Sequence, residues 1–213
     1  MKTFEELLDN AVAYHGHLCA GQVLGVRMAI TGCCLVNVLE PTDGKGLLVY
    51  VEIDRCATDA IQSVTGCKLG KRTLKYMDYG KMAATFFNME TGQAVRVLAR
   101  DDSREKAWAY APGAANKTEA QMIAYRAMSE EELFVLTPLR LIVPEEDMPG
   151  HPVAWVQCEQ CGERVNDRRE VRLPGHVLCR PCAFGGYYSS APSRSRVSAH
   201  PFVSRRWAWL RKE

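Results

Sequence analysis

Four cysteines in the C-terminal third have the spacing of metal ligands. Two residues separate Cys158 from Cys161, two separate Cys179 from Cys182, and 17 lie between the pairs. A two-residue spacer lets two thiolates hold one tetrahedral ion from a tight turn, and two such pairs complete a four-cysteine zinc site. Four thiolates leave no open coordination position, so the spacing predicts a structural zinc. The alternatives are four reduced structural thiols, two disulfides or a thiol redox pair.

A second group of metal-ligand residue types lies near the N-terminus. His15, His17 and Cys19 alternate in a short segment that also contains Gly16, whose freedom of backbone conformation favours a loop. Imidazole and thiolate together suit zinc or another transition metal. The pattern therefore predicts a metal site, and the alternative is two surface histidines beside a buried cysteine.

Cys56 is a further position where chemistry is expected. It follows the apolar run of residues 47–53, which predicts a buried strand, and precedes a helix expected from about residue 58. A helix N-terminus lowers the pKa of a cysteine, which would make Cys56 a thiolate ligand or nucleophile. Asp59 could orient a histidine ligand through a hydrogen bond, or it could be only a favourable charge in the first helical turn.

These residues form one set of candidates for a core site. The candidate catalytic residues are His17, Cys19, Cys56 and Asp59, and the first three are also candidate ligands of a second divalent metal. Three protein ligands would leave a fourth position open, as catalytic zinc requires.

The elements that must position these residues predict an α+β fold. Its core domain would combine helices with a mixed or antiparallel sheet, and a small zinc finger would follow. The pattern of apolar residues predicts helices over residues 3–14, 21–37, 58–65, 101–110 and 118–132, and strands over residues 47–53, 82–88, 94–100 and 139–143. Residues 144–152 have the composition of a linker. We therefore expect a core domain over 1–146, a zinc finger domain over 147–187 and a basic aromatic tail over 188–213.

Composition excludes wholesale disorder and restricts nucleic-acid binding to one end. The 213 residues are 47% hydrophobic and 24% charged, which is ordinary for a globular protein. The net charge is +2, but residues 189–213 carry six Lys or Arg and one Glu, so they account for +5 and the rest for −3. Nucleic acid would have to bind the tail, which contains Arg194, Arg196, Arg205, Arg206, Trp207 and Trp209. A solvated tail is the alternative.

The apolar run from Ala20 to Leu39 has the length of a membrane span, but Arg27 lies inside it and central Arg is costly in lipid. We expect a buried helix instead and no membrane association. Gly21, Gly25 and Gly32 favour close backbone contact, so this helix is predicted to form a homodimer interface. The first residues lack the apolar segment of a signal peptide and the number of cysteines is odd, which together predict a reduced cytoplasmic protein.

Several motifs in order resemble the family of proteins similar to the E subunit of formylmethanofuran dehydrogenase. They are HGHLCAG at 15–21, DRCATDAIQ at 54–62, TGCKLGK at 65–71, and DYGK at 78–81 followed by ATF at 84–86. The resemblance covers about residues 5–145. It implies an α+β core, an interlocked homodimer and a cleft lined by Cys and His. Within that cleft it places His17, Cys19 and Cys56 centrally, with His15, Asp59 and Cys67 as further candidates. Residues 155–186 resemble the treble-clef zinc finger that some members carry.

The resemblance implies a function only in outline. The first hypothesis is a metal-binding enzyme or accessory subunit of one-carbon or molybdenum/tungsten enzyme metabolism, within a larger enzyme complex. The alternatives are a zinc-finger regulatory module that binds nucleic acid or protein, and a metal or cofactor chaperone. The sequence contains no molybdopterin or iron–sulfur signature.

Overall fold

The computed structural model describes residues 2–39, 41 and 44–188. Contacts divide the chain into two compact units, and the division falls between His151 and Pro152. The expected division lay five residues earlier. Residues 144–148 are not a free linker, because Arg72 donates hydrogen bonds to the backbone carbonyls of Glu146 and Met148. The tail residues named above, Arg194 to Trp209, lie outside the described part of the chain.

The first unit is built on a five-stranded sheet with the strand order β2-β1-β3-β4-β5. β1 pairs with β2 in parallel, whereas the other neighbouring strands are antiparallel. The sheet is therefore mixed, which confirms the expected α+β class. The strands are β1 Leu47–Val51, β2 Leu74–Tyr76, β3 Ala83–Asn88, β4 Ala94–Ala99 and β5 Phe134–Leu139.

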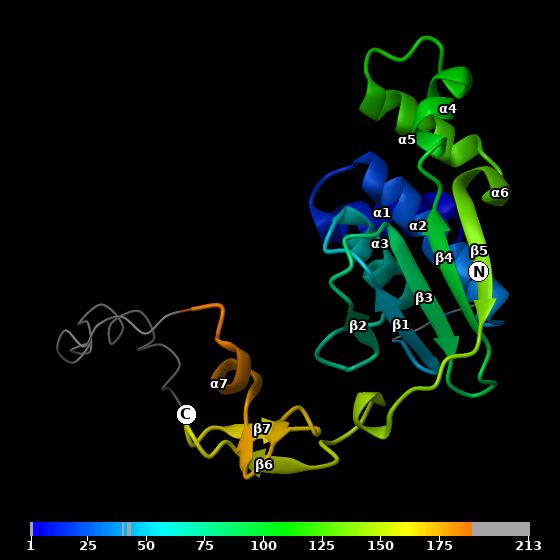
Figure 1. Cartoon of the computed structure of the whole chain (residues 1–213). Coiled ribbons are helices and arrows are strands. Elements are labelled where there is room, and N and C mark those ends of the chain that lie inside the picture. Colours follow the sequence, from blue (N-terminus) through cyan, green and yellow to red (C-terminus); the bar gives the residue numbers. More distant parts are fainter. Residues whose placement is uncertain (1, 40, 42–43, 189–213) are drawn as a thin grey trace, which may run out of the picture. The chain divides into compact units, whose positions relative to one another are not determined.

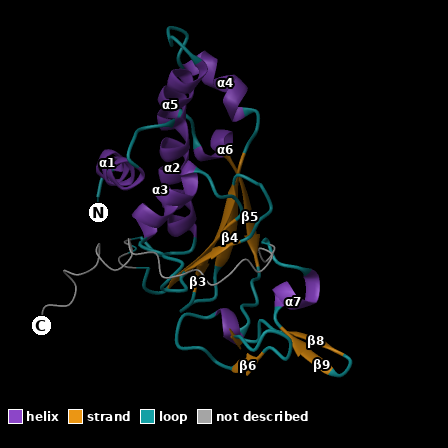
Figure 2. Ribbon diagram, turned by 90° about the vertical axis from the view of Figure 1, so that its left-hand side faces the viewer, coloured by secondary structure: helices purple, strands orange, loops and turns teal. Residues whose placement is uncertain are grey.

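Helices cover one face of this sheet (Figures 1 and 2). They are α1 Phe4–His15, α2 Ala20–Leu35, α3 Cys56–Thr65, α4 Ser103–Tyr110, α5 Lys117–Ala127 and α6 Glu130–Leu133. Alternate strand residues such as Val49, Phe86 and Val97 are fully buried in the main apolar cluster, together with Val26 of α2 and Ile61 of α3. No helix in the described ranges is long and apolar enough to cross a membrane.

The ends of α1 and α2 set the position of the His/Cys segment. Thr3 and Glu6 form a capping box that starts α1, and Gly16 ends it in the left-handed conformation with φ of 99°. Cys19 is then the N-cap residue of α2. His15 and Cys19 thus lie at the ends of two helices, with only three residues between them.

The glycines of α2 make close contacts within the chain. A Cβ atom at Gly25 would lie 2.7 Å from the Cα and carbonyl oxygen of Ala57 in α3, and one at Gly32 would overlap the ring of Phe86. Gly21 faces Cys56 in the same way. The expectation that these glycines approach the backbone of a second copy is therefore wrong, because α3 and β3 already occupy that side of the helix.

Two expected elements differ from the structure. The strand predicted over 139–143 is wrong, and the last core strand is instead β5, which pairs with β4 from Phe134 to Leu139. Leu139, Leu141 and Val143 still pack, but in a small cluster around Leu48 and Phe87. The helix predicted over 118–132 is split into α5 and α6 because Ser129 forms a new capping box with Glu132.

The second unit consists of two short hairpins and one helical turn. β6 Trp155–Gln157 pairs with β7 Arg164–Asn166, and β8 Val171–Leu173 pairs with β9 His176–Leu178. α7 follows at Arg180–Phe184. The predicted turn at Pro174-Gly175 joins β8 to β9, so this local expectation is confirmed.

The packing of α2 on α3 yields a stability prediction. We expect Gly25→Ala to lower the free energy of unfolding by about 1–3 kcal/mol, because the added methyl meets backbone atoms that cannot move cheaply. This loss exceeds the gain in helix propensity of at most about 1 kcal/mol. Chemical denaturation measures it. Gly113→Ala is the matched control, since a Cβ there meets nothing within 4 Å, and an equal effect in both variants would contradict the assigned contact.

Candidate functional site

Three potential metal ligands converge where α1 ends and α2 begins. One ligand atom from each of His15, His17 and Cys19 lies within 4.8 Å of the other two. The two imidazole rings are 4.6 Å apart between centroids. His15 and Cys19 are half-buried and His17 is exposed. The cluster is therefore anchored on the protein side and open to solvent through His17.

His15 is held by a carboxylate from another helix. Its Nδ1 lies 2.8 Å from Oδ2 of Asp59, in the first turn of α3. Its other ring nitrogen, Nε2, is buried and has no hydrogen-bond partner among the described residues. An Nδ1–H that donates to a carboxylate leaves Nε2 as a free acceptor, which is the tautomer that metal-ligating histidines adopt. The residues present therefore fit a metal ion better than a purely structural role.

Cys56 borders the cluster but is not one of its three converging atoms. A Cβ atom at Gly21 would lie 2.8 Å from the Cys56 Cβ and 3.6 Å from the Cys19 Sγ, so both cysteines flank one narrow space. Gln22 donates a hydrogen bond of 2.6 Å to the Cys56 carbonyl. His15, which was expected to matter less than Cys56, takes the place of Cys56 in the converging set.

The electrostatic expectation for Cys56 is wrong. Cys56 begins α3 as predicted, but its pKa is raised rather than lowered. Burial is the largest cause, and a hydrogen bond with Cys19 adds to it. Removal of the thiol from water opposes its ionisation more strongly than the helix N-terminus favours it.

Cys67 is separate from the site. It is fully buried in the core, where its thiol lies 3.7 Å from the carbonyl oxygen of Leu47. Burial raises the pKa of Cys67, and it raises the pKa of Cys33 to about 12. Both cysteines pack as small apolar residues, whereas Cys34, next to Cys33, is exposed.

The second cluster lies in the C-terminal unit. The sulfurs of Cys158, Cys161, Cys179 and Cys182 all lie within 4.8 Å of one another. The backbone amides of Cys161 and Cys179 point at the Cys158 sulfur and lower the pKa of that thiol to about 6. Hydrogen bonds with the neighbouring thiols, that of Cys179 first, raise the pKa of Cys182 to about 12. One thiol of the four is thus prepared as a thiolate at neutral pH.

Comparison with known proteins agrees with both clusters. Residues 14–135 match the family described as FmdE, molybdenum formylmethanofuran dehydrogenase operon, which covers more than half of the chain. The chain belongs to the FmdE family. Residues 152–188 match the prokaryotic dksA/traR C4-type zinc finger. This FmdE-family protein therefore carries a zinc-finger segment after its core, and the four converging cysteines lie within it.

Two individual relatives bear on the comparison. The FmdE-family chain is 32% identical over 209 residues to a protein of Archaeoglobus fulgidus described as a probable S-adenosyl-L-methionine-binding protein. The match covers 86% of this chain and 54% of the relative, so this chain spans about half the relative's length. The crystal structure of an FmdE-like protein of tungsten formylmethanofuran dehydrogenase, from Syntrophus aciditrophicus, matches with a TM-score of 0.57 at 21% identity. That match covers 88% of this chain and 96% of the other, and it shows a shared fold.

Sequence reasoning missed two parts of the site. Gln22 is fully buried and its Oε1 has no partner among the described residues, although it lies next to the cluster on α2. Gly21 fills the space between Cys19 and Cys56, whereas the sequence suggested a contact with a second chain. The signal for both was present in the run Cys19-Ala-Gly-Gln, because a glutamine is unusual inside an otherwise apolar helix.

The burial of the core cysteines predicts a difference in reactivity between neighbours. In the folded protein at pH 8, we expect iodoacetamide to label Cys34 readily and to leave Cys33 and Cys67 unlabelled, because a buried thiol with a raised pKa is neither accessible nor ionised. Peptide mass spectrometry before and after unfolding in guanidinium measures this. Rapid native labelling of Cys67 would show that it belongs to an accessible site after all.

Proposed function

We propose that the core of this FmdE-family protein holds a divalent metal through His15 Nε2, His17 and Cys19. The observation that carries the proposal is the buried Nε2 of His15, which has no partner in the described ranges while Nδ1 is paired with Asp59. An unpaired buried polar atom costs about 1–3 kcal/mol, so the fold needs a compensating ligand there. Imidazole and thiolate ligands favour zinc among the available divalent ions.

The residues around this site suit it to chemistry rather than to storage. A metal bound by three protein ligands would supply Lewis acidity to a molecule in the open fourth position. Asp59 fixes the orientation and tautomer of His15. His17 is exposed, so a small molecule has access from that side. Cys56, next to Cys19, carries a neutral thiol at neutral pH because its pKa is raised, and it can donate a proton or a hydrogen bond.

This arrangement supports a metal-dependent enzyme, or an accessory subunit of one-carbon or molybdenum/tungsten enzyme metabolism that acts in a larger complex. The description of the family by its operon supports that context. The S-adenosyl-L-methionine binding in the name of the Archaeoglobus relative is not carried over, since this chain spans only about half of that protein.

A second candidate function is regulation through the zinc finger. The dksA/traR-type match favours it, as does the tail's basic and aromatic composition. A metal or cofactor chaperone is the third possibility, and it would exchange its metal without turnover. The open side of the core cluster favours the first proposal, because a purely regulatory protein needs no accessible metal position.

We propose that the finger binds a structural zinc through its four cysteines and that it is a treble clef. The order of a Cys-x-x-Cys turn, a hairpin and a helix that carries the last ligand supports this assignment. We also propose a homodimer, on the family resemblance alone, and a cytoplasmic location. The latter is supported by nine free thiols.

The core proposal is tested by metal content. We expect inductively coupled plasma mass spectrometry to find two metal ions per chain in the purified protein, one for each cluster. The double variant His17→Ala/Cys19→Ser should retain one, because two of the three core ligands are gone. Asp59→Asn should weaken core metal affinity by about 10–100-fold, since the ligand histidine loses its orientation.

His151→Ala and Cys34→Ser are the matched controls, because each removes a residue of the same type outside both clusters. Both should retain two ions per chain. A wild-type protein with one ion, unchanged by His17→Ala/Cys19→Ser, would overturn the core proposal and leave the finger unaffected.

The finger proposal has its own variant. Cys179→Ser should lose one metal ion and expose residues 152–188 to proteolysis, while the core keeps its thermal transition, because a segment this small depends on the metal for folding. Limited proteolysis with and without a chelator measures this. Protease resistance of the metal-free segment would show that the four thiols are structural without metal.

A further inference from the structure

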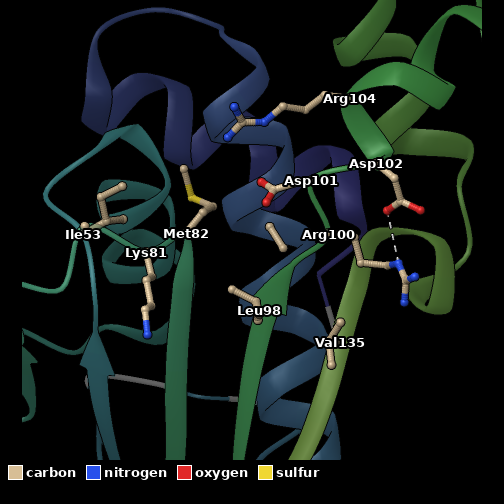
Figure 3. Close-up of a pocket in the computed structure, with 11 residues that line it drawn as sticks. Ile53, Lys81, Met82, Leu98, Arg100, Asp101, Asp102, Arg104 and Val135 are labelled. Atoms are coloured by element: carbon tan, nitrogen blue, oxygen red, sulfur yellow. Dashed lines mark hydrogen bonds and ion pairs between the residues drawn. The ribbon is translucent and has the colours of Figure 1, made fainter.

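A pocket without an assigned role lies at the edge of the sheet from which α3 begins (Figure 3). Its volume is about 500 Å³, which is within the range of small-molecule sites. Ile53, Met82, Leu98 and Val135 provide its apolar surface. The first three are half-buried and Val135 is 40% exposed, so the apolar surface is accessible from the pocket.

Strand register places this pocket beside the Cys/His cluster. Val51 pairs with Ala84, Ala83 with Leu98, and Leu98 with Val135, so the end of β1 and the ends of β3 to β5 meet at one sheet edge. The chain leaves this edge through Ile53 and begins α3 three residues later at Cys56. Pocket and cluster are thus joined by one short segment.

Most charged groups around the pocket already have partners. Asp102 pairs with Arg100 at 3.2 Å and with Lys106 at 2.9 Å. The backbone amides of Ser103 and Arg104 at the start of α4 donate to the carbonyls of Arg100 and Asp101, so these two amides are not available to an anion. Figure 3 shows the Lys81 amine pointing away from Arg104.

Arg104 and Asp101 are the exception. Both are exposed, and neither makes an ion pair with any other described residue within 4.0 Å. In Figure 3 both lie at the α4 end of the pocket, on the same side of Met82 and Leu98. One guanidinium and one carboxylate therefore face the same apolar hollow without neutralising each other.

We propose that this pocket binds a small zwitterion with an apolar body, such as an apolar amino acid or a molecule that ends in an amino-acid head group. The Arg104 guanidinium takes the carboxylate, since its planar donors match carboxylate geometry. Asp101 takes the ammonium group. The apolar body packs on Met82, Leu98 and Ile53. The proposal goes beyond the metal site and does not depend on it.

The charges also determine what the pocket rejects. A simple carboxylate satisfies Arg104 but leaves Asp101 without a cation, and a simple amine does the reverse. Inorganic phosphate meets the repulsion of Asp101 and has no apolar surface to bury. Both groups on one apolar ligand are therefore required for full affinity, which gives the proposal a matched set of probes.

The experiment is isothermal titration calorimetry on the full-length protein with four probes. L-Phenylalanine carries both groups, 3-phenylpropanoate lacks the amine, 2-phenylethylamine lacks the carboxylate, and inorganic phosphate tests a bare anion. We expect L-phenylalanine to bind at least about tenfold more tightly than each of the others. Arg104→Gln and Asp101→Asn should each weaken its binding at least about tenfold.

Lys117→Gln and Glu105→Gln are the controls, since both are exposed charges outside the pocket, and they should leave affinity unchanged. Thermal unfolding verifies that all four variants are folded. No binding of L-phenylalanine at about 10 mM, equal binding of 3-phenylpropanoate, or binding unaffected by Arg104→Gln would each overturn the proposal. The double variant His17→Ala/Cys19→Ser should still bind L-phenylalanine, which separates this outcome from that of the metal proposal.

Discussion

The close approach of α2 to α3 is the constraint on which the core site depends. Gly25 lies directly on the backbone of Ala57, and Gly21 lies against Cys56. Because neither glycine has a side chain, the N-terminal ends of the two helices meet, and each of them carries a cysteine. Asp59, one turn along α3, then lies within hydrogen-bond distance of His15 at the end of α1. Larger residues at either glycine would separate the three helix ends and disperse the cluster.

The core cluster is destabilising for the fold alone and favourable once a ligand is bound. The buried Nε2 of His15 and the buried Oε1 of Gln22 have no partner among the described residues, and each such atom costs free energy. The rest of the unit can bear this cost, because the sheet and helices bury a continuous apolar cluster from Leu8 to Phe134. Unsatisfied polar atoms in an otherwise well-packed core are expected where a site has been kept for function.

The sequence predicted local features well and distant contacts poorly. The Thr3 capping box, the Gly66 helix end and the hairpin turn at Pro174-Gly175 depend on neighbouring residues, and all three occur. The glycines of α2 were correctly linked to close packing, but periodicity does not show whether the neighbour is the same chain or another. Likewise, the pairing of His15 with Asp59 spans 44 residues, and the spacing of neither residue specifies the other. The shift of the last core strand to Phe134–Leu139 has the same origin, because pairing with β4 rather than local apolarity decides it.

The two metal-ligand clusters differ in what a metal must do for each. Within residues 152–188, only Cys158, Asp167 and Cys179 are buried, so the finger has almost no apolar interior and its folding free energy has to come largely from the metal. All four of its thiols are then committed to that ion. The core unit has an extensive apolar interior and needs no metal to fold. Its cluster offers three converging ligands, one of them exposed. A metal in the core is therefore free to interact with another molecule, and the sheet edge where α3 begins offers the nearest apolar pocket for one.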